Sequence, residues 1–138
     1  MTVEGPAAVI DTNVFGAELT RRGAAVADAY REHVEGRQLF ISFVTLAELR
    51  YGAAKKASER ITRQVEVVLA ALDVLPLEAP ADALYGMLRA RLEQAGQPIG
   101  GNDLLIAAQA LALGYTLVTD NEREFSRITE LPLENWLR

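Results

Sequence analysis

The sequence of 138 residues contains no cysteine and a single histidine, His33. Without cysteine there can be no disulfides and no thiolate chemistry, and one histidine cannot supply the ligands of a usual zinc site. Acid–base catalysis by histidine has only this candidate, and His33 is expected to be a surface residue of an amphipathic helix. These absences leave the oxygen-bearing side chains as the candidates for chemistry.

Long apolar runs are also missing, and none approaches the roughly 20 residues that a membrane-spanning helix needs. The first six residues lack the basic and then apolar grading of a secretory signal peptide. Half of the residues are hydrophobic and 24% are charged, which is typical of a soluble globular protein and excludes wholesale disorder. We therefore expect one cytoplasmic domain over residues 1–138, with no membrane partner.

The chain has no excess of positive charge, since its formal net charge is −5. Such a balance argues against a protein that holds nucleic acid by bulk electrostatic attraction. Residues 37–63 are the exception, because six basic side chains outnumber two acidic ones there and give a local charge of +4. This segment could face a polyanion, although the same side chains could simply keep a helix soluble.

Short runs of β-forming residues alternate with helical patterns along the chain. Strands are expected at 7–10, 39–43, 74–77, 115–119 and 131–133, and helices at 24–36, 45–56, 58–72, 80–95 and 102–113. Pro76 places the third strand at an edge or at a strand end. This alternation predicts an α/β domain with a mostly parallel sheet of four or five strands.

Four carboxylates are predicted near the carboxyl ends of the strands, where ligands bind in sheets of this kind. Asp11 follows the first strand, Asp120 follows the fourth, and Glu48 comes shortly after the second. Asp103 lies in the first turn of a helix, in line with the apolar stripe that faces the core. Converging carboxylates repel one another, and a cation would relieve the repulsion. Because only oxygen ligands are available, the expected ion is Mg²⁺, with Mn²⁺ as a substitute.

Each of these acidic residues also has a purely structural interpretation. Asp11 could cap the segment that follows it, and Asp120 could be an ordinary turn residue. Thr45 and Glu48 match a capping box, in which the two side chains satisfy backbone donors at a helix N-terminus. Asp103 at a helix start is favourable for the helix dipole. If the four acids do not form a site, every one of these structural interpretations must be correct at the same time.

Four sequence motifs resemble those of PIN-domain nucleases, and most closely those of the VapC-type toxins of bacterial toxin–antitoxin pairs. They are Val9–Val14, Phe43–Gly52, Asn102–Ala108 and Leu117–Phe125, and they occur in the family's order over nearly the whole chain. The resemblance implies a three-layer α/β/α sandwich and a Mg²⁺-dependent endoribonuclease. It also implies a cognate VapB-type antitoxin that docks into the active-site groove, a homodimer, and tRNA as the RNA substrate, the last from the pattern of the fourth motif.

The resemblance also assigns roles to particular residues. Asp11, Glu48 and Asp103 match the acidic residues of the family's metal site, in which the two aspartates are the usual direct ligands. Thr12 and Asn13 match the polar residues that support the first aspartate. We expect Glu48 either to complete the metal site or to act as the general base for the attacking water.

The fourth motif departs from the family pattern. The family's fourth acidic position is occupied here by Asn121, and Asp120 is its neighbour. A displaced carboxylate at Asp120, an amide ligand at Asn121 and a site of three acids are all open. We take Asp120 as the fourth catalytic residue, which would hold a second ion or a water bound to one.

The basic segment gives the expected contacts with partners. Arg50, Lys55 and Lys56 are predicted to contact the RNA backbone, or an acidic antitoxin tail that mimics it. Water attacking in line would leave a 5′-phosphate and would not require the 2′-hydroxyl, whereas chemistry of the ribonuclease A type lacks its histidines here.

Three other functions compete with this hypothesis. A phosphatase of the haloacid dehalogenase type has an aspartate at the position of Asn13, so that function is disfavoured. A receiver domain has its phosphorylated aspartate after the third strand, where this chain has Glu78. The main alternative is a catalytically inactive PIN domain that acts as a protein-interaction module.

Overall fold

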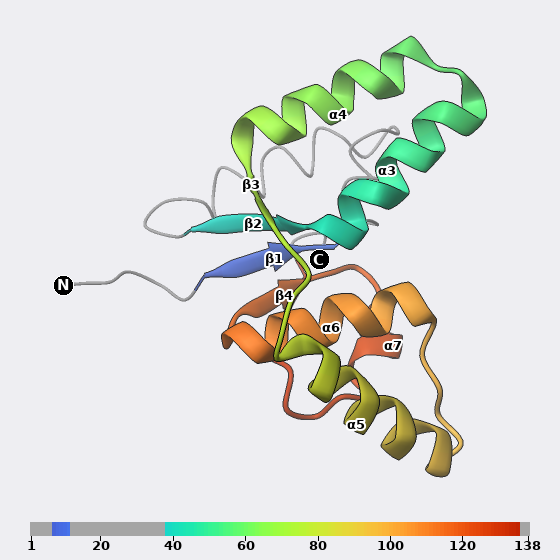
Figure 1. Cartoon of the computed structure of the whole chain (residues 1–138), viewed down its shortest axis with the longest axis vertical. Coiled ribbons are helices and arrows are strands. Elements are labelled where there is room, and N and C mark those ends of the chain that lie inside the picture. The colour runs from blue at the N-terminus through green and yellow to red at the C-terminus, as the bar shows by residue number, and fades with distance from the viewer. Residues whose placement is uncertain (1–6, 12–37, 136–138) are drawn as a thin grey trace, which may run out of the picture.

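The central feature of the fold is one parallel sheet of five strands, seen in a computed structural model that describes residues 7–11 and 38–135 (Figure 1). The strands are β1 (Ala8–Ile10), β2 (Leu39–Ser42), β3 (Asp73–Leu75), β4 (Thr116–Val118) and β5 (Leu133–Glu134), in the spatial order β3-β2-β1-β4-β5. All four neighbouring pairs are parallel. The predicted α/β class with a parallel sheet is confirmed, and β3 is an edge strand, as Pro76 indicated.

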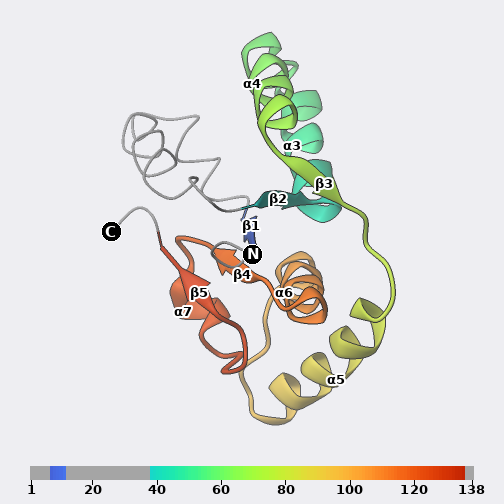
Figure 2. The same cartoon turned by 90° about the vertical axis from the view of Figure 1, so that its left-hand side faces the viewer.

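Helices cover both faces of the sheet, which gives three layers. They are α3 (Phe43–Lys56), α4 (Glu59–Ala71), α5 (Ala81–Gln94), α6 (Gly101–Leu113) and the short α7 (Glu122–Phe125). The hairpin of α3 and α4 lies on one side of the sheet, and α5 and α6 lie on the other (Figures 1 and 2). Among the described residues, no helix is both long and apolar enough to cross a membrane. The predicted helix at 24–36, His33 within it, Thr12 and Asn13 lie outside the described residues.

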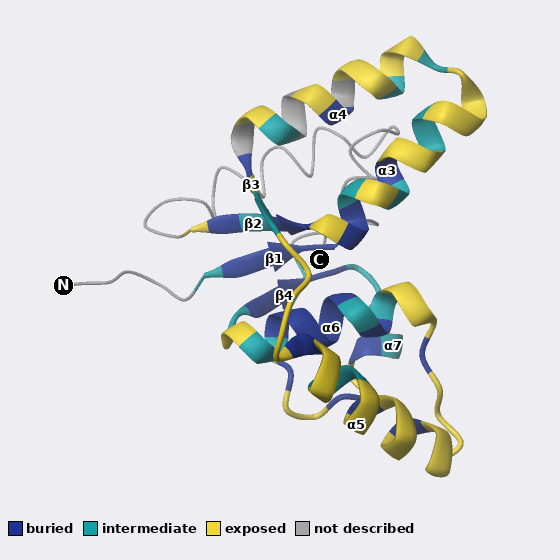
Figure 3. Ribbon diagram, in the orientation of Figure 1, coloured by how far each residue is buried: buried dark blue, intermediate teal, exposed yellow. Residues whose placement is uncertain are grey.

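The core consists of two apolar clusters, one on each face of the sheet. Ile10 of β1 belongs to the cluster with α3 and α4, which includes Leu49 and Val65. Its neighbour Val9 belongs to the cluster with α5 and α6, which includes Leu88. Alternate residues of a strand point to opposite faces, so a strand covered on both faces must be apolar throughout. Figure 3 shows β1 in the colour of buried residues along its length. The run that precedes Asp11 therefore places this acid at the end of a fully buried strand.

The start of α3 differs from the capping box that the sequence indicated. The helix begins at Phe43, and Ser42 is its N-cap, with Oγ accepting the N–H of Val44 at 3.1 Å. Thr45 lies in the first turn and is fully buried, so it is not the N-cap. The capping-box interpretation of Glu48 is therefore wrong, because a box with this glutamate needs Thr45 as the N-cap, and the N-cap is Ser42, three residues earlier.

Prolines set the bounds of the two outer strands. Because proline cannot donate to a ladder hydrogen bond, it occurs at strand ends and edges. β3 ends at Leu75, directly before Pro76, and β5 begins at Leu133, directly after Pro132. The strands expected at 74–77 and 131–133 are therefore displaced by one or two residues in the structure.

Candidate active site

Asp11 and Thr119 lie side by side where the two central strands end. Ile10 of β1 pairs with Val118 of β4 in parallel, so the next residue of each strand emerges at the same edge of the sheet. The N–H of Asp11 donates to the carbonyl of Val118 at 2.8 Å, and Thr119 Oγ1 donates to Asp11 Oδ2 at 2.8 Å. Asp11 is only 2% exposed. The edge therefore presents a buried carboxyl group with a fixed hydrogen-bond donor.

Asp103 faces three other acids at this edge. Burial raises the pKa of Asp103 to about 8, and a hydrogen bond between its carboxyl group and Glu124 adds to the shift. The negative charges of Asp11, Glu124 and Glu48 raise it further. At neutral pH Asp103 therefore keeps a proton, because an ionised carboxylate is unfavourable in a partly buried position beside other acids. Asp11 and Glu48 therefore lie close enough to Asp103 for their charges to raise its pKa, and the roles predicted for these three acids in a metal site stay a prediction.

Glu48 reaches the cluster from the other helix layer. It stands in the second turn of α3 and is partly buried, and Asn102 Nδ2 donates to its Oε2 at 3.3 Å. Asn102 directly precedes Asp103 in the first turn of α6. This hydrogen bond joins α3 to α6 at the point where each helix carries an acidic residue of the cluster.

The fourth motif contributes Glu124, a residue that the sequence did not single out. The Asn121 side chain donates to Glu124 Oε1 at 3.4 Å, and its backbone N–H donates to Thr119 Oγ1 at 2.9 Å. Asn121 is the N-cap residue of α7, so the first turn of this short helix places Glu124 beside it. The spacing of three residues at a helix start was the signal that could have pointed to Glu124.

Asp120, the acid that the sequence predicted for the fourth position, forms a hydrogen bond with Asn135. Its Oδ1 accepts a hydrogen bond from Asn135 Nδ2 at 3.1 Å, and the same amide donates to Glu122 Oε2 at 2.9 Å. Asp103 has its shared hydrogen bond with Glu124 instead. The role predicted for Asp120 stays a prediction, and two acids of the fourth motif now compete for it.

The three predicted basic contacts are exposed along α3. Arg50 forms an ion pair with Glu66 of α4 at 4.0 Å. The ammonium group of Lys55 lies 5.7 Å from the centre of the Tyr51 ring. Lys56 is in the last turn of the same helix and is exposed. These side chains are therefore available to a partner, with the charge of Arg50 partly balanced by Glu66.

An open groove of about 640 Å³ adjoins the acidic cluster. Its lining includes Glu48 and Asn102 together with Phe43, Tyr51, Leu77 and Leu105. Phe43 and Tyr51 are 55% and 65% exposed, which is unusual for large aromatic side chains. The groove therefore presents apolar and aromatic side chains to solvent beside Glu48 and Asn102.

The side chains at this edge fit a divalent cation, although they are not gathered as ligands. The described residues contain no group of three or more acidic or histidine side chains already arranged to hold a metal ion. The donors are nevertheless all oxygens, the kind that Mg²⁺ binds. The pKa of Asp103 is raised mainly by burial and further by the charges of Asp11, Glu124 and Glu48, and a bound cation would relieve the repulsion among these charges. Metal binding at this site would have to displace the proton of Asp103.

The fold and the acidic edge together define a domain of a known class. A parallel sheet with helices on both faces brings acids from the end of β1, from α3, from α6 and from α7 to one edge. The family model for the PIN domain matches residues 8–131, which is nearly the whole sequence of 138 residues. The class is therefore that of PIN domains.

Individual relatives narrow this class. "Ribonuclease VapC2" of Rickettsia felis is 39% identical over 133 residues, which cover 93% of this chain and 96% of the relative. "tRNA(fMet)-specific endonuclease VapC" of Shigella flexneri is 36% identical over 129 residues, with 93% and 96% covered. The crystal structure of VapBC2 from Rickettsia felis bound to a promoter DNA fragment matches with a TM-score of 0.88 and 37% identity, covering 94% and 98%. The chain belongs to the VapC ribonucleases of the PIN-domain family.

Proposed function

We propose that this ribonuclease is a divalent-metal-dependent endonuclease that cleaves tRNA and acts as the toxin of a toxin–antitoxin pair. The observation that carries the proposal is the cluster of Asp11, Glu48, Asp103 and Glu124, in which the pKa of Asp103 is raised to about 8. The substrate is taken from the relatives, since those of Shigella flexneri and Salmonella typhimurium are both named tRNA(fMet)-specific endonucleases.

Asp11 and Asp103 are the residues that we propose to hold the metal ion, which would be Mg²⁺ with Mn²⁺ as a substitute. When bound, such an ion neutralises charge on the scissile phosphate and lowers the pKa of water beside it. Thr12, Asn13 and Asn121 are proposed to support the acidic side chains. Asp103 contributes as a ligand only after it has lost the proton that it shares with Glu124.

Glu48 is our candidate for the general base. It lies on α3, it is partly exposed, and its Oε2 is oriented by Asn102 at 3.3 Å, so its carboxylate is held but not fully desolvated. In this position it could accept a proton from the water that attacks the phosphodiester. Attack in line would release a 5′-phosphate end without using the 2′-hydroxyl of the ribose.

Glu124 and Asp120 are both candidates for the fourth catalytic acid, and we propose Glu124. Its carboxyl group bonds to Asp103 and to the Asn121 amide, which places it within the cluster. Asp120 bonds to Asn135 in the described structure. The two residues can be separated by experiment, because each can be changed to its amide without altering the size of the side chain.

The proposed partners are an antitoxin of the VapB type and a second copy of this chain. Solved structures of relatives from Rickettsia felis and Haemophilus influenzae are VapBC complexes. Arg50, Lys55 and Lys56 are the proposed contacts with the RNA backbone or with an acidic antitoxin segment. We place the protein in the cytoplasm, where tRNA is found.

Cleavage of a total tRNA pool tests the proposal. Purified, antitoxin-free protein should cut tRNA at specific sites with Mg²⁺ and should stop cutting with EDTA. Asp11→Asn should abolish cutting, whereas Asp82→Asn, an exposed residue of α5, should not. The products should carry 5′-phosphate ends. Metal-independent cutting that survives Asp11→Asn would overturn the mechanism, and no cutting by folded protein would favour the inactive interaction module.

A further inference from the structure

The hydroxyl group of Thr119 joins two parts of the acidic site. Its Oγ1 accepts the N–H of Asn121 at 2.9 Å and donates to Asp11 Oδ2 at 2.8 Å. Thr119 is completely buried, with 0% of its surface exposed. A buried hydroxyl that is bonded on both sides has a defined orientation. We infer that Thr119 is a positioning residue of the proposed nuclease site, which sets the orientation of the Asp11 carboxylate for metal binding.

The backbone holds both members of this pair in place. The N–H of Asp11 donates to Val118 of β4 at 2.8 Å, and the N–H of Thr119 donates to Glu134 of β5 at 2.9 Å. Threonine is branched at Cβ, which restricts its side chain to few rotamers. The hydroxyl is therefore a rigid donor built on the sheet, and the carboxylate that accepts from it loses rotational freedom before any ligand binds.

The same hydroxyl connects Asp11 to the acid on α7. Asn121, whose N–H binds Thr119, donates from its side chain to Glu124 at 3.4 Å. Glu124 in turn bonds to Asp103. Thr119 therefore lies between the acid at the end of β1 and the pair formed by α6 and α7. Residues that orient the ligands of a metal in this manner change its affinity by roughly 10- to 100-fold when they are replaced.

A purely structural role of Thr119 makes a different prediction. Valine has nearly the same shape as threonine but has no hydroxyl, whereas serine keeps the hydroxyl and loses the methyl group. If packing alone matters, Thr119→Val should bind Mg²⁺ as the unchanged protein does, and Thr119→Ser should bind it more weakly. If the hydroxyl orients Asp11, the order of Mg²⁺ affinities should be the reverse of the order expected from packing.

The test is titration of antitoxin-free protein with Mg²⁺ by calorimetry, with tRNA cleavage as a second readout. Thr119→Val should bind Mg²⁺ roughly 10- to 100-fold more weakly, and Thr119→Ser should stay within about threefold of the unchanged protein. Thr116→Val is the matched control, because Thr116 is a buried threonine at the opposite end of β4 from Thr119 and pairs with Ala8, away from the acids. Thermal melts establish that each variant is folded, and Thr119→Ala replaces Thr119→Val if the latter is not.

The inference rests on the proposed function, and the two can fail separately. If the unchanged protein binds neither Mg²⁺ nor Mn²⁺, the proposed metal site is wrong and the inference falls with it. If the unchanged protein binds Mg²⁺ and Thr119→Val binds it equally well, the proposed function stands and the role of Thr119 is refuted. Equal losses in Thr119→Val and Thr119→Ser would also refute it, because the methyl group would then be the part that matters.

Discussion

Asp103 and Glu124 share a hydrogen bond although both are acids, and this is possible only because one of them keeps its proton. Asp103 stands at the start of α6 and Glu124 in α7, so the pair closes one side of the acidic edge. The metal-free site therefore holds a proton in the place where the proposed function requires a cation. The competition between proton and cation has consequences that can be measured.

Mg²⁺ affinity should rise as the pH increases towards about 8. The pKa of Asp103 is raised to about 8, so below that pH an incoming ion must displace a proton, and above it the site is already ionised. Calorimetry at about pH 6.5, 7.5 and 8.5, in buffers of different ionisation enthalpy, measures both the affinity and the protons released. Close to one proton should be released at the lowest pH. An affinity that is constant over this range would contradict the protonation of Asp103.

Asp103→Asn should stabilise the metal-free protein while removing its activity. The carboxyl pKa lies at about 8 in the folded chain against an ordinary value of 3.8. At a pH between these two pKa values, Asp103 is ionised in the unfolded chain and protonated in the folded chain. The free energy of unfolding of the unchanged protein therefore falls as the pH rises through this range. The variant should therefore unfold with a free energy about 1 to 2 kcal/mol higher at pH 8, with no gain below about pH 4. Thermal melts with EDTA, with Asp82→Asn as the control, measure this difference.

The sequence located the strands of the site but could not provide their register. The apolar run before Asp11 and the run before Thr119 both indicated buried strands that end at one edge, and the structure confirms this. Which residue of the second strand lies opposite Asp11 depends on how β1 and β4 are aligned. β4 ends at Val118, so Thr119 meets Asp11, and the next residue, Asp120, bonds to Asn135.

The other differences come from short local structures. Glu124 approaches Asp103 only because four residues form the single turn of α7, and so short a helix leaves no periodic pattern in the sequence. The cap of α3 was misplaced for a similar reason, since Ser42 and Thr45 are both good N-cap residues. The choice between them depends on where β2 ends, which is a property of the sheet and not of the local sequence.

Glu124→Gln should impair cleavage far more than Asp120→Asn. The first change removes a charge that faces Asp103, whereas the second removes a charge at a carboxylate that bonds to Asn135. We expect a fall in kcat/KM of roughly 100-fold or more for Glu124→Gln and less than about tenfold for Asp120→Asn. Single-turnover cleavage of tRNA by the two variants, at equal protein concentration and saturating Mg²⁺, provides the comparison. The reverse order would make Asp120 the fourth acid, as the sequence predicted.

Ser42→Ala and Thr45→Val should have opposite consequences for stability. The Ser42 hydroxyl caps α3, and loss of such a cap costs about 1 kcal/mol. Thr45 Oγ1 is buried and finds no hydrogen-bond partner among the described residues, so its replacement by an apolar group of the same shape should be neutral or stabilising. Urea unfolding of the two variants measures both free energies. A loss of about 1 kcal/mol in Thr45→Val would instead support the capping box that the sequence indicated.

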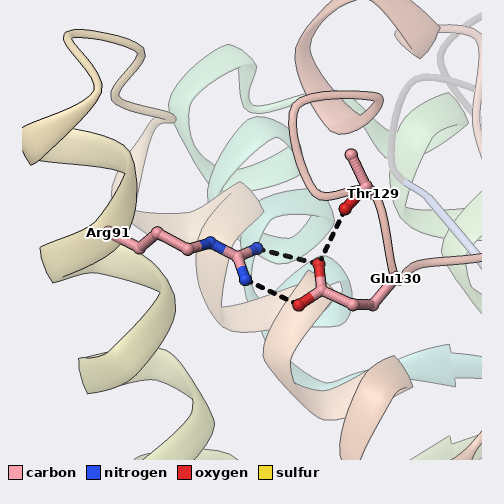
Figure 4. Close-up of polar contacts among 3 residues, drawn as sticks. All are labelled: Arg91, Thr129 and Glu130. Carbon is pink, nitrogen blue, oxygen red and sulfur yellow. Dashed lines mark hydrogen bonds and ion pairs between the residues drawn. The ribbon is translucent and has the colours of Figure 1, made fainter.

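Arg91 and Glu130 should stabilise the protein at neutral pH and lose this effect in acid. Arg91 of α5 donates to both oxygens of Glu130, at 2.6 and 2.8 Å, and Thr129 donates to one of them (Figure 4). The hydrogen bonds from Arg91 are the main reason that the pKa of Glu130 falls from 4.5 to about 2. The folded state therefore releases this proton more readily than the unfolded state, so the contribution of the ion pair to stability is complete above about pH 4.5 and declines as the pH falls towards 2.

Because both side chains are largely exposed, Arg91→Met should lower the melting temperature by less than about 3 °C at pH 7. Arg89→Met, which removes an ion pair within α5 only, is the matched control. Melting curves of the two variants at pH 7 and near pH 3 should show a deficit for Arg91→Met that shrinks in acid, and a deficit that grows in acid would contradict the lowered pKa of Glu130.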